Sequence, residues 1–116
     1  MERNDVAVFY DIENLLKGIE NARKLYEQLK LKVIRERIAE ALGPSARLAV
    51  QRAYADWSGF PYCMLRSGLV EALIEPVQIF AFNRMGTKNA ADIELALDAV
   101  QLGHDRPHIG TIVIVS

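Results

Sequence analysis

Cysteine and histidine are scarce in this chain. One cysteine among 116 residues, Cys63, excludes an internal disulfide framework. That usage is typical of a reducing cytoplasm, where we expect the protein to be located. Cys63 has apolar neighbours and no nearby histidine to activate it, so we expect a small buried side chain and not a nucleophile. His104 and His108 flank a predicted loop at the end of the sheet away from any site, and neither is expected to be a ligand.

An excess of charge of one sign is also missing. The chain has 14 Lys and Arg against 15 Asp and Glu, a formal net charge of −1. No overall positive field attracts nucleic acid, so any such binding depends on a local basic patch. Long hydrophobic runs are absent too, because Glu71, Glu75 and Pro76 interrupt the longest one, residues 69–82. It is too broken for a membrane-spanning helix, and the polar first residues are unlike a secretory signal.

What the sequence does have is an alternation of strand and helix patterns within one domain of ordinary size. Strands are predicted over residues 5–10, 47–55, 77–82 and 111–115, and helices over residues 22–42, 61–74 and 90–102. The βαβαβαβ order with continuous apolar strands predicts a three-layer α/β/α sandwich around a mainly parallel sheet. Residues 111–115 are apolar on both faces, which predicts a central position in that sheet.

Asp11 ends the first predicted strand, directly after Val6-Ala7-Val8-Phe9-Tyr10. Ligands of open α/β sheets bind beyond the carboxyl ends of the strands, so an acid at this point is placed for chemistry. The alternative is structural, since Asp is also a favoured N-cap for the helix that follows. The residue pattern alone leaves both interpretations open.

A second acid, Asp92, falls in the first turn of the helix predicted from residue 90, with Thr87 or Asn89 as its cap. The helix dipole favours a carboxylate there, for a site or for stability alone. Asp98 lies about 240° further around the helix, which predicts a supporting or solvated role and no direct metal partnership with Asp92. Two apolar faces predict that this helix is buried around much of its circumference; the first comprises Ile93, Leu97 and Val100, and the second Leu95, Ala99 and Leu102.

Asp11 and Asp92 come from different βα units, yet both are predicted at one edge of the sheet, facing a shared pocket. Carboxylates without a Cys or His cluster suit a hard cation such as Mg²⁺ or Mn²⁺. Two acids are a weak signal, because metal-dependent phosphodiester cleavage normally uses three or four.

Four blocks of the chain together resemble the NYN domain, a branch of the PIN-like metal-dependent nucleases that includes the bacterial LabA-like proteins. The most specific features are a strand ending in Asp-x-x-Asn and a helix carrying Lys-x-x-x-Asp-x-x-x-x-x-Asp. The four blocks cover residues 8–15, 53–57, 88–99 and 111–116.

The resemblance implies a PIN-like fold, a Mg²⁺ or Mn²⁺ site and RNA as substrate. By motif position, Asp11 and Asp92 would be the catalytic, metal-binding carboxylates. Asn14 would orient the first of them, and Asp98 would support the site from behind. Asp56 and Trp57 would lie on the rim, although a turn acid and a partly buried anchor are the favoured roles for this pair.

The chain departs from the family pattern at its end. The family continues after the last strand with a Gly-Asp-Ser-Asp-Phe type loop that carries further acids, whereas this sequence stops at Ser116. We therefore expect one domain over residues 1–116 that is incomplete at its C-terminus, with weak metal affinity and little or no cleavage. An uncovered last strand also predicts self-association, for instance as a homodimer.

Arg84 and Lys88 flank the loop after the third predicted strand, on the same edge as the acids, and are candidates for binding RNA phosphates. Taken singly, each is better explained as a solvated charge. Two other functions stay open: a non-catalytic RNA-binding or protein-interaction module on the same scaffold, and a phosphohydrolase or nucleotide-binding domain. The last is weakened, because neither an Asp-x-Asp pair nor a Gly-rich phosphate loop follows the first strand.

Overall fold

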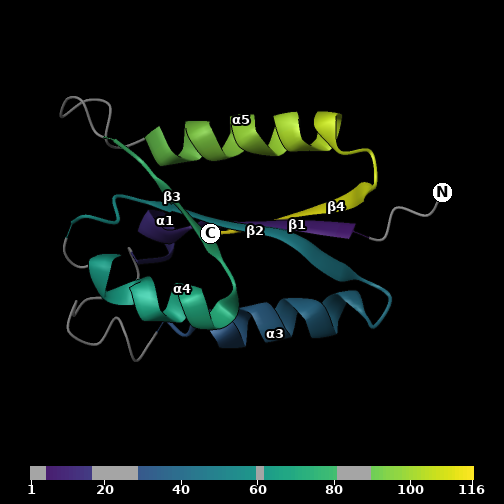
Figure 1. Cartoon of the computed structure of the whole chain (residues 1–116), viewed down its shortest axis with the longest axis horizontal. Helices are drawn as coiled ribbons and strands as arrows, with labels where there is room; N and C mark the ends of the chain where they lie inside the picture. The colour runs from purple at the N-terminus through teal and green to yellow at the C-terminus, as the bar shows by residue number, and fades with distance from the viewer. Residues whose placement is uncertain (1–4, 17–28, 60–61, 81–89) are drawn as a thin grey trace.

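The computed structural model describes residues 5–16, 29–59, 62–80 and 90–116. Helices and strands alternate along these ranges, as the sequence predicts (Figure 1). In chain order they are β1 (Asp5–Asp11), α1 (Ile12–Leu16), α3 (Leu31–Leu42), β2 (Arg47–Ala55), a 3-10 turn (Tyr62–Leu65), α4 (Arg66–Ala72), β3 (Glu75–Gln78), α5 (Ala90–Asp105) and β4 (Ile109–Val115).

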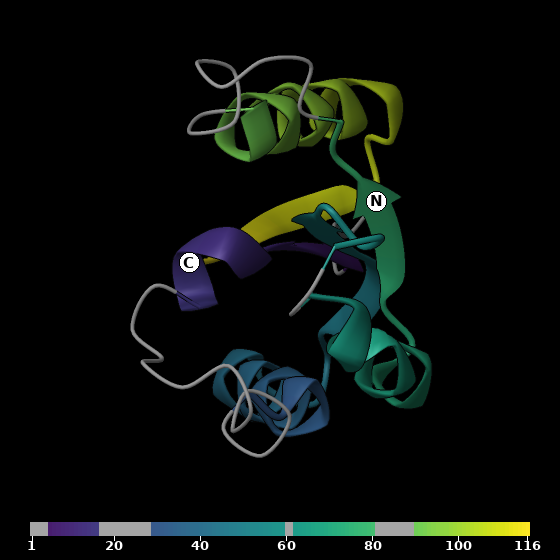
Figure 2. The same ribbon diagram turned by 90° about the vertical axis from the view of Figure 1, so that its left-hand side faces the viewer.

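The four strands form one parallel sheet in the order β3-β2-β1-β4. Helix α5 covers one face of the sheet, and α3 and α4 cover the other (Figures 1 and 2). The predicted α/β class with a parallel sheet and three layers is confirmed. The carboxyl ends of all four strands meet at the same edge, which is where a parallel sheet places a ligand site.

Strand β1 is buried on both faces because it lies between β2 and β4 and under both helical layers. Val6, Val8 and Tyr10 pack with α3 and α4, whereas Ala7 and Phe9 pack against α5. This two-sided burial explains the continuous apolar run that precedes Asp11. Along the described strands, β1 is the most deeply buried, and it positions the acid that follows it.

The prediction that the last strand is central is wrong for the described sheet. β4 pairs with β1 and stands at the edge in the strand order. Ile112 and Ile114 point to the same face as Ala7 and Phe9, yet they are 40% and 55% exposed. An apolar sequence shows which residues favour burial, but it does not show whether a neighbouring strand buries them.

Several predicted boundaries also need correction. Helix α3 begins at Leu31, and residues 22–28 of the longer predicted helix lie outside the described residues. Helix α4 ends at Ala72, followed by Leu73 in the left-handed conformation with φ of 59°. β3 starts earlier than predicted and includes Pro76, which can be accommodated because β3 is the other edge strand of the described sheet.

The prediction that α5 is buried around much of its circumference is wrong. Its inward face packs on the sheet through Ala91, Leu95, Ala99 and Leu102. The other predicted apolar face, with Ile93, Leu97 and Val100, is exposed. The physical reason is that one helix covers this side of the sheet, so only one of its faces has a partner there. The helix also continues to Asp105, which places His104 in its last turn and not in a loop.

None of the helices in the described ranges combines the length and the apolar composition needed to cross a bilayer.

Candidate functional site

Asp11 lies at the carboxyl end of β1, where α1 begins. Its side chain is buried, with 5% of the residue exposed. The backbone N–H of Asn14 donates a hydrogen bond of 3.2 Å to Asp11 Oδ1. This is the contact of an N-cap residue, so the structural role considered for Asp11 is confirmed. Capping uses one of its oxygens and fixes the carboxyl group at the sheet edge.

Asp92 lies in the first turn of α5 and is itself exposed. The structure brings its carboxyl group to that of Asp11, and the two share a hydrogen bond that requires a proton on one of them. Both line one pocket of about 360 Å³, together with Asn14, Leu95, Ala96, Ile114 and Ser116. Two acids that are 81 positions apart in the sequence therefore meet at one pocket.

Burial raises the pKa of Asp11 to about 6, and the hydrogen bond with Asp92 adds to this effect. The Asn14 N–H acts in the opposite direction by stabilising the carboxylate, while the charges of Asp92 and Glu13 raise the pKa further. A strongly shifted carboxyl group next to a second one in a pocket is characteristic of functional sites, because two adjacent negative charges are unfavourable without a compensating cation or proton.

The pair fits a divalent cation in its chemistry. Carboxylate oxygens are the ligands that Mg²⁺ and Mn²⁺ prefer, and a cation could replace the proton that the two groups share. Within the described part of the chain, no group of three or more His, Cys, Asp or Glu side chains lies close enough together to hold a metal ion. The described residues thus bring two carboxyl groups together, and two carboxylates alone bind such ions weakly.

Asp98 does not line the Asp11–Asp92 pocket. Its Oδ2 accepts a hydrogen bond of 2.6 Å from the hydroxyl of Tyr54, whose side chain is completely buried in β2. It borders a separate polar pocket of about 250 Å³ with Arg52 and Arg106. Asp98 and Asp92 thus line different pockets, as their angular separation around the helix predicts. Asp98 nevertheless has a specific partner, Tyr54, and this hydrogen bond joins α5 to the sheet.

The sequence analysis did not identify Tyr54 as a partner of Asp98. Tyr54 and Tyr10 are both buried, and the hydroxyl of each reaches a polar group. Tyr10 donates to Gln51 Oε1 at 2.9 Å, and burial raises the pKa of Tyr10 to about 12. A buried tyrosine usually needs such a partner, which is the signal that indicates a polar neighbour without identifying it.

Asp56 and Trp57 have the structural roles favoured from the sequence. Asp56 Oδ1 accepts hydrogen bonds from Ser58 and Gln78, which hold the pKa of this carboxyl below its usual value. The indole N–H of Trp57 lies within hydrogen-bonding distance of the carbonyls of Ala53 and Val77. Together these hydrogen bonds connect the end of β2 to β3, and neither residue lines the carboxylate pocket. Cys63 is half-buried and not part of any described cluster.

The remaining predicted residues can be placed only in part. Arg84 and Lys88 lie outside the described residues, as do the proposed caps Thr87 and Asn89. Asn14 lines the carboxylate pocket and contacts Asp11 through its backbone. Ile114 was not predicted in the site. β4 brings Ile114 and Ser116 there because it lies beside β1, with Phe9 opposite Ile114.

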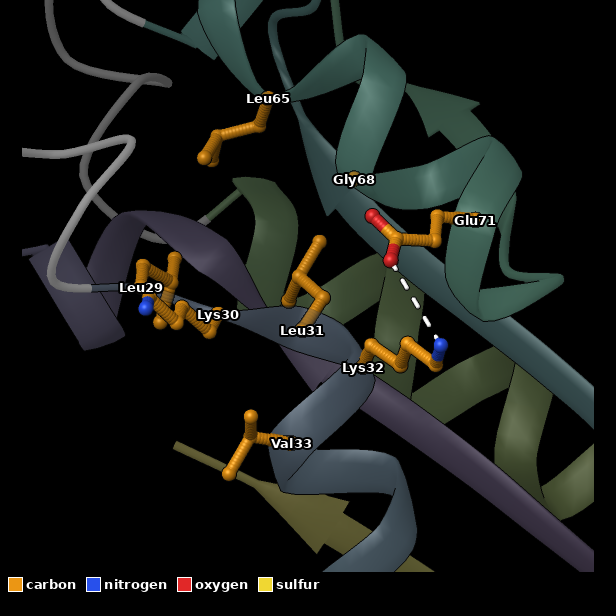
Figure 3. A pocket seen from close by; sticks show the side chains of 8 residues that line it. All are labelled: Leu29, Lys30, Leu31, Lys32, Val33, Leu65, Gly68 and Glu71. Carbon is orange, nitrogen blue, oxygen red and sulfur yellow. Dashed lines mark ion pairs between the residues drawn. The ribbon is translucent and has the colours of Figure 1, made fainter.

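A second pocket, of about 320 Å³, lies between the start of α3 and helix α4 (Figure 3). Its walls are largely apolar, with Leu29, Leu31 and Leu65 among them. Its one acidic residue, Glu71, forms an ion pair of 3.7 Å with Lys32. A lone acid that is already paired does not provide a cation site, so the carboxylate pocket is the better candidate for chemistry.

A model of the NYN domain matches residues 5–116. The chain belongs to the NYN domain family. This family is associated with nuclease activity, and the four-stranded parallel sheet with helices is consistent with a PIN-like fold. A search of curated proteins found no match to the chain. Membership of the LabA-like branch stays a prediction.

Proposed function

We propose that this NYN domain is a metal-dependent ribonuclease domain that uses Mg²⁺ or Mn²⁺ to cleave RNA phosphodiester bonds. The observation that carries the proposal is the contact between the Asp11 and Asp92 carboxyl groups in one pocket at the carboxyl edge of the sheet. Two adjacent carboxylates repel each other, and a cation bound between them relieves that repulsion.

Asp11 and Asp92 would hold the ion, which when bound activates water and stabilises the leaving oxygen. The Asn14 N–H fixes the orientation of Asp11. Tyr54 holds Asp98 and thereby the position of α5, on which Asp92 lies. Arg84 and Lys88 are proposed to bind the RNA backbone through its phosphates, because an acidic site needs positive charges to attract a polyanion.

A second function is supported by the small number of ligands. The described residues contain two carboxylates in contact and no larger acidic group. That arrangement also suits a non-catalytic RNA-binding or protein-interaction module that has kept the scaffold. The two functions differ in one measurable property, since only the first requires divalent metal for a chemical change in RNA.

The test is a calorimetric titration of the 116-residue chain with Mn²⁺, followed by cleavage assays on a fluorescent single-stranded RNA with Mn²⁺ or EDTA. We expect weak Mn²⁺ binding and slow cleavage. Asp11→Asn and Asp92→Asn should abolish both, whereas Glu40→Gln, an exposed acid on α3, should change neither. Equal Mn²⁺ binding by all four proteins would refute the proposed site. RNA binding without metal-dependent cleavage would favour the second function.

Self-association through β4 is a further part of the proposal. Ile112 and Ile114 are exposed on this strand, which contains no charged residue and no proline. Such an edge lacks the features that normally prevent strands from pairing between molecules. Sedimentation should detect a dimer that Ile114→Lys dissociates; a monomer at high concentration would contradict this.

A further inference from the structure

The outward face of α5 carries a row of large apolar side chains, which we call the α5 stripe: Ile93, Leu97 and Val100. Their spacing of four and three residues places them on one side of the helix. They are 58%, 64% and 73% exposed, whereas the inward residues of the same helix are buried against the sheet. The helix therefore has two apolar faces, and the sheet uses one of them.

Helix formation does not account for the stripe. Ile93 and Val100 are β-branched, and such residues are poorer helix formers than Glu, Lys or Gln. Packing within the described structure does not account for it either, because α5 is the outermost described element on its side of the sheet (Figures 1 and 2). Apolar residues gathered on a surface commonly mark a site of protein interaction.

The charges of α5 indicate the kind of partner. The helix has four acidic residues and neither Lys nor Arg: Asp92, Glu94, Asp98 and Asp105. Asp92 is engaged with Asp11, and Asp98 with Tyr54. Glu94 and Asp105 are exposed. Glu94 lies three residues before Leu97, so it borders the stripe on the helix surface. The stripe thus has an acidic margin.

We propose that the α5 stripe binds a basic amphipathic helix of a partner protein. Apolar residues of that helix would pack on Leu97 and its neighbours, and its Lys or Arg residues would face Glu94 and Asp105. A second copy of α5 is a poor partner, because it would present the same acids to this margin and like charges across an interface repel each other.

This interaction goes beyond the proposed nuclease function and is independent of it. The stripe faces away from the sheet, whereas Asp92 faces Asp11 in the carboxylate pocket. A helix bound to the stripe would therefore leave that pocket accessible. The partner would bring the domain to its place of action without blocking the site.

The probe is a synthetic helical peptide of about 20 residues, long enough to form a helix in solution. It carries Leu at the spacing of the stripe and Lys along one edge, and a matched peptide carries Glu in place of Lys. Binding to the full chain is measured by fluorescence anisotropy. We expect the basic peptide to bind at least about tenfold more tightly than the acidic one, because only its charges complement the margin.

Three variants locate the binding surface. Leu97→Gln should weaken binding of the basic peptide about tenfold or more, since it removes the central apolar contact. Val70→Gln is the matched control, because Val70 is 77% exposed on α4, on the other side of the sheet, and its replacement should change nothing. Glu94→Lys should lower affinity for the basic peptide and raise it for the acidic one. Circular dichroism verifies that all three variants are folded.

Four results would each overturn the proposal. The first is equal affinity for the basic and acidic peptides, and the second is unchanged binding in Leu97→Gln. The third is an equal loss in Val70→Gln, which would show non-specific apolar binding. The fourth is no binding of either peptide together with a dimer that Leu97→Gln dissociates, which would make a second copy of the chain the occupant.

Discussion

The two ends of β1 carry the same type of residue in opposite surroundings. At the amino end, Arg47 Nη2 lies 2.6 Å from Asp5 Oδ2, and His108 Nε2 lies 3.5 Å from the same oxygen. At the carboxyl end, Asp11 meets a second acid, Asp92. The hydrogen bond from Arg47 holds the pKa of Asp5 below its usual value, whereas burial and Asp92 raise that of Asp11 to about 6.

This difference separates a structural carboxylate from a candidate functional one. The charge of Asp5 is compensated within the protein, so the ion pair needs no ligand. The charges of Asp11 and Asp92 repel each other, and either a proton or a cation between the two groups relieves that repulsion. Within one strand, therefore, the chemistry of the neighbours distinguishes the end that stabilises the fold from the end that is suited to bind an ion.

The largest effect is expected on metal-dependent cleavage. Asp11→Asn or Asp92→Asn removes one of two proposed ligands, and we expect a loss of activity of about a hundredfold or more, because losing even a supporting group of a metal site costs about 10–100-fold. Asn at position 11 still accepts the Asn14 N–H and keeps the cap. The measurement is cleavage of labelled RNA at several Mn²⁺ concentrations, with Asp5→Asn as the control at the other end of the strand. Equal losses in all three variants would show that the effect is structural.

The second largest effect is expected on the free energy of unfolding of the metal-free protein, which should depend on pH. The pKa of Asp11 is raised in the folded state, so the folded state holds the proton more tightly than the unfolded state. The contribution of Asp11 to the free energy of unfolding is complete below its unfolded pKa of 3.8 and is lost as the pH rises through its folded pKa of about 6. At roughly 1.4 kcal/mol for each pH unit between the two pKa values, the change is up to about 3 kcal/mol.

Urea unfolding in EDTA from pH 4 to pH 8 measures this change. Asp11→Asn should flatten the curve and stabilise the metal-free protein at pH 7. Added Mn²⁺ should stabilise the wild-type protein increasingly as the pH rises, since the ion replaces the proton. A wild-type curve as flat as that of Asp11→Asn would mean that the two carboxyl groups do not interact in solution.

A smaller effect is expected from the contact between β2 and α5. Tyr54→Phe removes the hydroxyl that donates to Asp98 and retains the ring that packs near Phe9. We expect a loss of about 1–2 kcal/mol in the free energy of unfolding, typical of a hydrogen bond to a charged group that is partly exposed. A double-mutant cycle with Asp98→Asn measures the coupling. Additive losses would show that the hydroxyl and the carboxyl act separately.

The sequence indicated the carboxylate pair because two local patterns determine it. An apolar run ending in Asp11 predicts a buried strand with an acid at its carboxyl end, and a helical pattern places Asp92 in a first turn. In a parallel sheet, both positions belong to the same edge. The fold class followed from the same patterns, because strands and helices alternate and the strands are apolar on both faces.

Other features depend on which elements become neighbours, and local patterns do not specify that. The bond between Tyr54 and Asp98 joins residues 44 positions apart. The edge position of β4 depends on strand order, which its apolar sequence does not show. Helix α5 has two apolar faces in its sequence, and only the packing on the sheet decides which one is buried.

The smallest effect on stability is expected from Asp5 at the amino end of β1, where the direction of the change is more informative than its size. Because the pKa of Asp5 is lowered in the folded state, its contribution to stability is present above the unfolded pKa of 3.8 and disappears as the pH falls through the lower folded value. Asp5→Asn should therefore lower the urea midpoint slightly at pH 7 and have no effect in strong acid, with Arg47→Gln giving the same pattern. This is opposite to Asp11→Asn, which stabilises the metal-free protein at pH 7. If both Asp→Asn variants shifted the midpoint in the same direction, the two ends of β1 would not differ in the way their neighbours indicate.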